Sequence, residues 1–360
     1  MGMLARHRKF WFAAVLPLLF LPMIREALHP QGGSAFTPPA NLAEIPKSVD
    51  TYLRENFGFR DQLLHGNARL HYALGSPTTG KVALGKAGWL FLTDDAAMQQ
   101  SMGDRMRVAQ VTAMADFVKR MHWELAARGA QLIVAVPPNS QSVNREVLPD
   151  WAAYTGKRTE YGLFLTLIAE RNLPFVDLKE MLIKAKREMP VYLKTDTHWN
   201  NHGALLAFNE IMHGLGKEDW AFDPAKVEKG FETIGGGDLA RVIGMDKDLA
   251  DSQMRLDIPA VPVETVDLDD REVQWTYVDT RNPADPSKPT IMVFGDSFTR
   301  AHFRELLMQH AGRLVWTHHR QCGFDWSLLE TYKPDIVIFA PTERYVLCAE
   351  NRVPLNLPPH

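Results

Sequence analysis

The residues best suited to chemistry in this chain are a serine, a histidine and an aspartate. Ser297 follows the apolar run Thr290–Phe294, where a buried strand would end in a tight turn and a helix would begin. Backbone N–H groups at such a turn can face developing negative charge, but a serine needs a base to become a nucleophile. We predict one site in which Ser297 is the nucleophile, His198 is the base and Asp196 orients the imidazole.

Neither half of this pattern is specific by itself. Asp296 or Ser297 could simply cap the next helix, and a histidine near a helix start is often a structural partner. Together, the Gly-Asp-Ser turn and the Asp-Thr-His segment favour a catalytic site, because each follows a predicted strand. Residues two apart in an extended loop point to the same side, so Asp196 could hold one ring nitrogen of His198 while the other faces Ser297.

A metal site is the competing interpretation of the same segment. His198 and His202 are four residues apart, a spacing that can bind zinc from one helix face, with Asp196 as a third ligand. Trp199 stands where a His-Glu-x-x-His motif would have its glutamate, so we expect no metal ion. The dipeptide His318-His319 shows no third ligand nearby and is expected on the surface or in a loop.

Four further residues could contact a substrate or an oxyanion, and each has a structural alternative. Asn139 could donate to an oxyanion or only close a turn after two prolines. Arg300 and Arg344 could bind a carboxylated substrate, although salt bridges with Asp296 and Glu343 are the favoured interpretation. Trp199 could stack on a sugar ring, but packing beneath the histidine is slightly favoured.

The elements that position these residues alternate between apolar strands and amphipathic helices. Gln131–Val136, Thr290–Phe294 and Asp335–Ala340 are continuous apolar runs that predict buried strands of a parallel sheet. Such alternation predicts an α/β fold with helices on the sheet and right-handed crossovers, and sites at the carboxyl ends of the strands. Residues 217–289 break the rhythm and are predicted to form an inserted mixed segment over or beside the site.

Shorter elements complete the prediction. A helix is expected over Asp104–Arg128, with Gly129 as its C-cap. Its predicted buried stripe consists of Val111, Ala115, Val118, Met121 and Leu125. The others are two short helices within Ser48–Leu74, a hairpin within Lys81–Leu92, a strand at Phe175–Leu178, helices at Thr159–Arg171, Lys179–Glu188 and Asn201–Leu215, and a strand at Val273–Val278.

The N-terminal region resembles a targeting signal. A basic flank precedes the apolar run Phe10–Ile24, a pattern typical of a secretory signal or a signal anchor. The run is shorter than the roughly 20 residues that span a bilayer comfortably, and we favour an uncleaved anchor at residues 1–28 over a cleaved signal. Residues 29–46 are predicted to be a linker, followed by a domain over 47–348 and a tail over 349–360. The positive flank would stay in the cytoplasm while the remainder is exported.

Composition narrows the class of protein further. The 360 residues are 46% hydrophobic and 23% charged, which suits a well-packed globular protein. A net charge of -3 gives no electrostatic reason to expect nucleic acid as a partner. Cys322 and Cys348 are the only cysteines, and in an exported chain they could form one disulfide.

Several short motifs occur in the order found in a known family. They are Gly58-Phe59-Arg60, Gly88-Trp89-Leu90-Phe91, Val136-Pro137-Pro138, Thr195-Asp196-Thr197-His198-Trp199-Asn200, Gly237-Asp238-Leu239, Gly295-Asp296-Ser297-Phe298 and Glu343-Arg344. On these motifs the chain resembles the alginate O-acetyltransferase family (AlgJ/AlgX-like) over about residues 45–348. The resemblance implies an SGNH-hydrolase-like fold with a permuted order, in which the Asp-His pair precedes the serine.

The resemblance also implies an activity and a location. It implies transfer of acetyl groups onto an exopolysaccharide in the periplasm, with Ser297, His198 and Asp196 as a triad and without a cofactor. It implies a polysaccharide acceptor and a membrane-bound O-acyltransferase that supplies the acetyl group at the inner membrane. Two alternatives remain open from the sequence, a periplasmic carbohydrate acetyl esterase and a non-catalytic scaffold of a polysaccharide secretion complex.

Overall fold

The computed structural model describes residues 41–55, 59–76, 79–152, 154–270, 275–319 and 326–347. The chain divides into two compact units, Met1–Thr78 and Thr79–His360. The described part of the first unit includes the helices α2 (Ile45–Glu55) and α3 (Arg60–Ala73), as predicted for residues 48–74. Within the described residues, none of the helices is both long and apolar enough to cross a membrane.

The second unit is built on a six-stranded sheet with the strand order β3-β10-β8-β9-β7-β6. Its strands are β3 (Gln131–Val134), β6 (Glu264–Asp270), β7 (Trp275–Arg281), β8 (Thr290–Gly295), β9 (Arg313–His318) and β10 (Ile336–Ala340). Neighbours among β3, β10, β8 and β9 pair in parallel, whereas β7 pairs antiparallel with β9 and β6 antiparallel with β7. Gly295 at the end of β8 pairs with Ala340 and His318, so the carboxyl ends of three strands meet at one edge.

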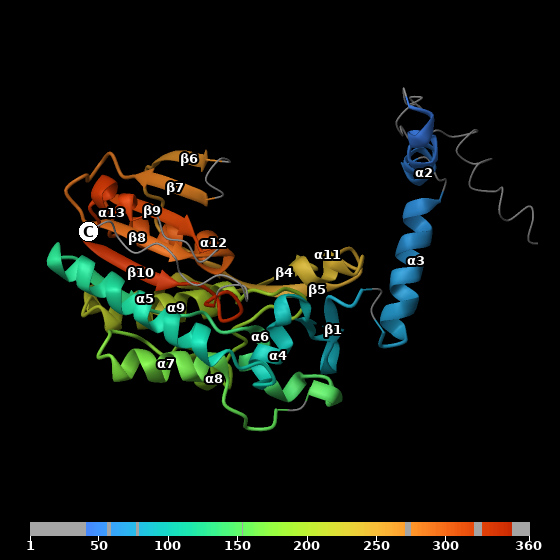
Figure 1. The fold of residues 1–360 in the computed structure, drawn as a ribbon, viewed down its shortest axis with the longest axis horizontal. Coiled ribbons are helices and arrows are strands. Elements are labelled where there is room, and N and C mark those ends of the chain that lie inside the picture. Colours follow the sequence, from blue (N-terminus) through green and yellow to red (C-terminus); the bar gives the residue numbers. More distant parts are fainter. Residues whose placement is uncertain are drawn as a thin grey trace, which may run out of the picture. The chain divides into compact units, whose positions relative to one another are not determined.

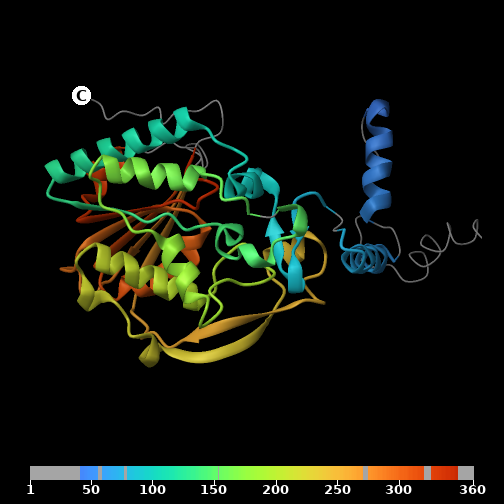
Figure 2. The ribbon, with the colours of Figure 1, turned by 90° about the horizontal axis from the view of Figure 1, so that it is seen from below.

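Helices cover both faces of this sheet, as Figures 1 and 2 show. The helices of the second unit are α4 (Ala97–Met102), α5 (Val108–Ala127), α6 (Ser140–Val143), α7 (Glu160–Glu170), α8 (Leu178–Ala185), α9 (Asn201–Gly214), α10 (Pro224–Val227), α11 (Asp238–Val242), α12 (Ser297–Met308) and α13 (Ser327–Tyr332). α5, α7 and α13 pack on one face, and α8, α9 and α12 pack on the other.

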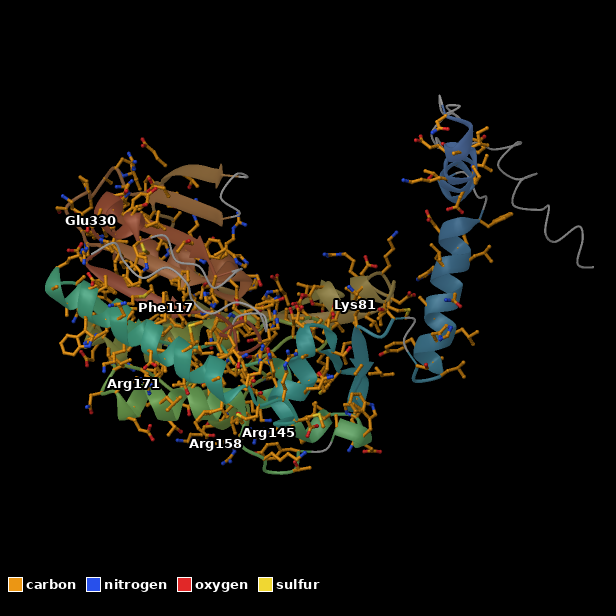
Figure 3. All side chains as sticks on the ribbon, viewed as in Figure 1. Lys81, Phe117, Arg145, Arg158, Arg171 and Glu330 are labelled. Atoms are coloured by element: carbon orange, nitrogen blue, oxygen red, sulfur yellow. The ribbon has the colours of Figure 1, made fainter. Side chains whose placement is uncertain are left out.

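The alternation of side chains along the strands explains the two layers. In β8, Met292 and Phe294 enter the core under α5 and α7, whereas Ile291 and Val293 enter the core under α9 and α12. All four are fully buried, so the strand is apolar without interruption, as strands covered on both faces require. On the α5 side, Phe117 (Figure 3) contacts Trp326 edge to face with ring centroids 5.8 Å apart. The predicted buried stripe of α5 is confirmed, because Val111, Ala115, Val118, Met121 and Leu125 are all buried.

Two smaller antiparallel sheets accompany the central one. β1 (Val82–Leu84) and β2 (Leu90–Leu92) form the predicted hairpin. β4 (Glu228–Gly235) and β5 (Ala250–Leu256) form a second pair, which carries α11 in its connection. The β1–β2 hairpin lies at the end of the second unit where α11 is seen in Figure 1, whereas the β4–β5 pair runs from that end along the unit in Figure 2, where β5 contacts α9.

The structure corrects two predictions about strands. Phe175–Leu178 is not a strand, because only Phe175 makes an isolated bridge to Val134, and the Asp177 side chain caps the start of α8 by accepting from Lys179 N and Glu180 N. Residues 217–289 are more than an insertion beside the site. Their second half supplies β6 and β7, which extend the central sheet through β9. The strand predicted at Val273–Val278 corresponds to β7, which runs from Trp275 to Arg281.

Candidate active site

Ser297 is placed by the turn that joins β8 to α12. It is the first residue of α12, and it is exposed to solvent. Asp296 is the N-cap, and its Oδ1 accepts from the Phe298 backbone N–H at 3.1 Å. The same carboxylate accepts from the Thr342 backbone N–H and hydroxyl, each at 2.7 Å. Asp296 therefore links the turn to the chain after β10. This link fixes the backbone position of the next residue, Ser297.

His198 lies on a tight loop that turns back before α9. A bridge between Tyr192 and Trp199 closes this loop, and the Asn200 side chain caps α9 by accepting from Gly203 N. His198 Nε2 is 2.7 Å from Ser297 Oγ. The loop thus brings the imidazole to the start of α12, across 99 residues of sequence.

Asp196 lies on the other side of the imidazole. Its Oδ1 is 2.6 Å from His198 Nδ1 and also accepts from the His198 backbone N–H at 2.9 Å. An ionised carboxylate can only accept hydrogen bonds, so Nδ1 carries the ring proton. In the neutral ring Nε2 is then the acceptor that faces the Ser297 hydroxyl, which is the arrangement needed for a general base.

The charge of Asp196 is secured by its partners. Burial alone would raise the pKa of this carboxyl, but the hydrogen bond and charge of His198, with backbone N–H groups of Asp238 and His198, lower its pKa to about 2. The Asp238 N–H donates to Asp196 Oδ2 at 2.8 Å. Asp196 therefore stays anionic across the pH range in which His198 would act as a base.

The lowered pKa of Asp196 predicts a pH-dependent contribution to stability. The folded pKa lies below the value of about 3.9 for an unfolded aspartate, so the contribution is full above pH 4 and is lost as the pH falls towards 2. A shift of this size corresponds to about 2 kcal/mol. In urea unfolding, the free energy of unfolding of the wild type should exceed that of Asp196→Asn by more at pH 6 than at pH 3. If the difference in the free energy of unfolding between wild type and variant is the same at both pH values, Asp196 does not have a lowered pKa in the folded protein.

Gly237 sits directly against the aspartate. A Cβ at this position would lie 2.4 Å from Asp196 Cβ and 2.5 Å from Asp196 Oδ2, closer than real Cβ contacts. The Gly237 N–H donates to Thr195 Oγ1 at 2.9 Å, which holds the two segments together. The glycine therefore allows α11 to approach the histidine loop closely enough for the Asp238 N–H to reach the carboxylate.

Replacing Gly237 by alanine should displace Asp196 and impair catalysis. Misplacement of a catalytic group by about 1 Å can cost about 100-fold in rate, so we expect kcat/KM to fall by about 10- to 100-fold. The matched control is Gly235→Ala, because a Cβ there would only meet Asp246 O at an ordinary 3.8 Å. Equal activity of the two variants towards an acetyl ester would contradict this role of Gly237.

Aromatic rings support the imidazole from the core side. The centroids of His198 and Phe298 are 4.8 Å apart. Trp199 contacts Phe298 edge to face at 5.1 Å and stacks on Phe303 at 5.8 Å. Trp199 is fully buried, so the interpretation that it stacks on a sugar ring is wrong and the packing alternative holds. Residues next to a histidine in sequence point away from it, and here that direction leads into the core.

The triad opens into a cleft of about 600 Å³. Besides the triad's serine and histidine, the cleft is lined by Leu92, Asp94, Asp95, Thr197, Asp238, Leu239, Val242, Asp296, His318, Arg344 and Tyr345. The Tyr345 hydroxyl donates to Asp95 at 2.7 Å across its rim, and Lys81, at the β1 end of the unit (Figure 3), pairs with Asp94 at 3.0 Å. Sequence reasoning missed Asp94, Asp95 and Tyr345 because they belong to loops that come together only in the fold.

Of the remaining predicted substrate residues, only Arg344 lines this cleft. Its guanidinium lies over the rings of Phe298 and Tyr345 and reaches Asn139 Oδ1 at 3.3 Å. Asn139 is buried, and its side-chain amide donates to Ser101 Oγ, so it is a structural residue rather than an oxyanion donor. Arg300 faces a separate pocket of about 160 Å³ beside Trp316, one turn further along α12.

The predicted salt-bridge partners of these arginines are engaged elsewhere. Asp296 is bound to Thr342, as described above, and not to Arg300. Glu343 is buried and accepts from the Asn139 backbone N–H at 2.8 Å and the Ser142 hydroxyl at 2.9 Å. The sequence interpretation of ordinary ion pairs is therefore wrong for both residues.

The histidine pattern that resembled a zinc site has another explanation. His202 is buried, and its Nδ1 is 2.5 Å from Glu228 Oε1, away from the triad. Ligand atoms of Asp196, His198 and Asp238 do lie within 4.8 Å of one another. Both ring nitrogens of His198 are committed to Asp196 and Ser297, however, so a metal ion would have to replace one of these hydrogen bonds.

His318-His319 is not a surface pair. His318 ends β9 and lines the cleft. His319 is buried between the rings of Phe294 and Phe339, and burial lowers its pKa to about 4. Cys322, Cys348 and the predicted anchor at residues 1–28 lie outside the described residues.

The mixed sheet with helices on both faces, the serine after one of its parallel strands and an Asp-His pair on a loop beside it are the features of an SGNH hydrolase-like α/β protein. The family model described as "SGNH hydrolase-like domain, acetyltransferase AlgX" matches residues 82–334, and the chain belongs to this family. The resemblance and the fold class expected from the sequence are thus confirmed. The Asp-His pair precedes the serine in the chain, as the resemblance implied.

Several known proteins are similar to parts of this chain. "Probable alginate O-acetylase AlgJ" of Pseudomonas syringae pv. tomato is 24% identical over 167 residues, which is 46% of this chain and 41% of that protein. The protein of the same name from Pseudomonas aeruginosa is 31% identical over 137 residues, 38% of this chain and 34% of that protein. The chain therefore matches less than half the length of these relatives. The solved "O-Acetyltransferase Domain of Pseudomonas putida AlgJ" is 20% identical, with a TM-score of 0.48, over 74% of this chain and 91% of that one.

Proposed function

We propose that this protein is an O-acetyltransferase that transfers acetyl groups onto hydroxyls of an exported polysaccharide through an acetyl-serine intermediate. The observation that carries the proposal is the continuous hydrogen-bonded chain from Asp196 through His198 to Ser297 at an open cleft. The names of the curated relatives, which describe alginate O-acetylases, support acetyl transfer and a polysaccharide acceptor.

In the first half-reaction Ser297 Oγ attacks the acetyl carbonyl of a donor ester. His198 Nε2 takes the hydroxyl proton as the new C–O bond forms, and it returns that proton to the leaving group as the donor's ester bond breaks. The resulting imidazolium is stabilised by the charge of Asp196, whose hydrogen bond also keeps the ring in position. The product of this step is the acetylated serine.

In the second half-reaction a sugar hydroxyl attacks the acetyl-serine. His198 takes the hydroxyl proton, the acetyl group moves to the sugar, and the proton passes back to Ser297 Oγ. Both steps place negative charge on the carbonyl oxygen. Ser297 begins α12, and first-turn N–H groups have no acceptor within the helix, so its N–H and the positive helix end are suited to this oxyanion. Arg344 provides a cation in the same cleft.

We further propose that the protein works on the periplasmic side of the inner membrane. The basic flank and apolar run of residues 1–28 support an anchor there, and a membrane-bound O-acyltransferase is the proposed source of the acetyl group. The chemistry is consistent with this arrangement because the triad needs an activated acetyl ester delivered to the cleft. Co-purification of the full chain with such a membrane protein would test the partner.

The test of the activity uses the full chain purified in detergent, with 4-nitrophenyl acetate as donor. Oligosaccharides of a polyuronate, a neutral glucan and an amino sugar are offered separately as acceptors. Mass spectrometry should detect a sugar whose mass rises by one acetyl group, and Ser287→Ala, on an exposed turn, is the control that should keep this activity. Release of acetate without any acetylated sugar would overturn the transferase assignment in favour of an esterase. No turnover of any acetyl ester would favour a scaffold.

A further inference from the structure

A second carboxylate lies beside the imidazole, on the same side as Asp196. Asp238 Oδ2 is 3.7 Å from His198 Nδ1, and Thr197 stands between them. The Thr197 hydroxyl donates to Asp238 Oδ2 at 2.6 Å, and its backbone N–H donates to Asp238 Oδ1 at 2.8 Å. Both carboxylate oxygens of Asp238 are therefore hydrogen-bonded to Thr197.

The Thr197 hydroxyl also faces the ring. Thr197 Oγ1 is 3.2 Å from His198 Nδ1, the nitrogen bound to Asp196 at 2.6 Å. A hydroxyl has one proton and two lone pairs. With its proton on Asp238, Thr197 Oγ1 can only accept from the ring, which favours a proton on Nδ1.

The opposite orientation of the same hydroxyl would work against catalysis. A Thr197 proton that pointed to the ring would donate to a bare Nδ1 and would favour the tautomer with its proton on Nε2. That tautomer presents a donor to Ser297 Oγ and cannot take the hydroxyl proton. The direction of one threonine hydroxyl therefore bears on which ring nitrogen of His198 is protonated.

We propose that Asp238 is a positioning residue that holds the Thr197 hydroxyl proton away from the imidazole and so maintains the catalytic tautomer of His198. The inference rests on the proposed function of the triad. Asp238 belongs to α11, inside the segment that interrupts the α/β order, so this segment would complete the active site rather than merely lie beside it. Its N–H adds a second contact by donating to Asp196.

The chain contains a matched control for a merely structural role. Thr195, two residues before Thr197, pairs with Asp251 in a similar way: the Thr195 hydroxyl and backbone N–H both donate to Asp251 Oδ2, at 2.8 and 2.7 Å. Asp251 therefore anchors the same loop with the same chemistry, but its hydroxyl partner is Thr195 rather than the threonine beside the ring. Loss of Asp251 should affect stability without affecting the tautomer.

The test is a double-mutant cycle in the full chain, with kcat and KM measured separately on an acetyl ester. Asp238→Asn should lower kcat by about tenfold with little change in KM, because an amide can donate to Thr197 Oγ1 and free its proton. Thr197→Val should lower kcat by a few-fold. Adding Asp238→Asn to the Thr197→Val variant should lower kcat by less than a further twofold, because valine has no hydroxyl proton that could turn towards the ring. Asp251→Asn should combine additively with Thr197→Val.

A second readout does not depend on turnover. Proton NMR of the ring should show the His198 Nδ1–H signal in the wild type and in Thr197→Ser, which keeps the hydroxyl, and a shifted or weakened signal in Asp238→Asn. If Asp238→Asn does not fold, Asp238→Glu, which moves the carboxylate, should show the same dependence on the Thr197 hydroxyl. The inference would be overturned if Asp238→Asn lowered kcat by the same factor in the wild type and in Thr197→Val and left the His198 Nδ1–H signal unchanged. Absence of acetyl transfer in the wild type would instead overturn the proposed function, because the NMR signal would still report the tautomer.

Discussion

Replacing Ser297 by alanine is expected to reduce acetyl transfer by about 10⁴-fold or more, because removal of the nucleophile of a triad abolishes most of its rate enhancement. The fold should be unaffected. Ser297 is exposed, and its turn is held by the Asp296 carboxylate rather than by the serine side chain. We therefore expect the free energy of unfolding to change by no more than about 0.5 kcal/mol.

The measurement combines kinetics with covalent labelling. A sulfonyl fluoride should add one sulfonyl group to the wild type, on the peptide that contains Ser297, and none to the Ser297→Ala variant. Ser287→Ala serves as the control, because the Ser287 hydroxyl donates to Asp285 on an exposed turn, and this variant should label and react like the wild type. Polysaccharide acetylation by Ser297→Ala in cells at the wild-type level would refute covalent catalysis and support the scaffold interpretation.

Replacing Asp196 by asparagine should be nearly as severe, with a loss of about 10³- to 10⁴-fold in kcat. The amide is close in size to the carboxylate, so the packing around it should persist. Its NH₂ group would donate to His198 Nδ1, whereas the carboxylate accepts from it. The ring proton would then sit on Nε2, which could no longer accept the proton of Ser297.

Two observations would separate this effect from simple unfolding. Asp251→Asn removes another buried carboxylate, which lies on β5 and binds Thr195 of the same loop, and it should lower stability without a comparable loss of kcat. The reactivity of Ser297 towards a sulfonyl fluoride should fall in Asp196→Asn but persist in Asp251→Asn. If Asp196→Asn retained a tenth or more of the wild-type kcat, Asp196 would not be the residue that orients the imidazole.

The hydrogen-bonded arrangement of Asp196, His198 and Ser297 could be predicted from the sequence because its parts have local signatures. Ser297 follows a strand that is apolar without interruption, and the alternation of buried side chains in β8 shows why such a run needs cover on both faces. Asp196 and His198 are close in the chain, so their mutual contact is a local property of one loop. Only the proximity of the two segments was an inference, and in the fold the loop before α9 meets the start of α12, with His198 Nε2 2.7 Å from Ser297 Oγ.

Predictions failed where a side chain had a choice of partners. Arg300 and Asp296 are close in sequence, but the Asp296 carboxylate accepts hydrogen bonds from Thr342, which follows β10 in the chain. Asn139 has the chemistry of an oxyanion donor, yet the fold buries it against Ser101. In each case the outcome depends on residues distant in the chain, which spacing does not reveal.

What the amino-acid sequence determined by itself was most of the order of strands and helices, the turn that carries Ser297 and the Asp-His loop, since these follow from apolar periodicity and from contacts between near neighbours. The tertiary structure alone decided how the triad is supported. Gly237 and Asp238 reach Asp196 and Thr197 from a segment about 40 residues away, and Arg344 and Tyr345 reach the cleft from beyond β10. The physical reason is that hydrogen bonds select partners by position in space, and those positions exist only once the sheet and its helices have packed.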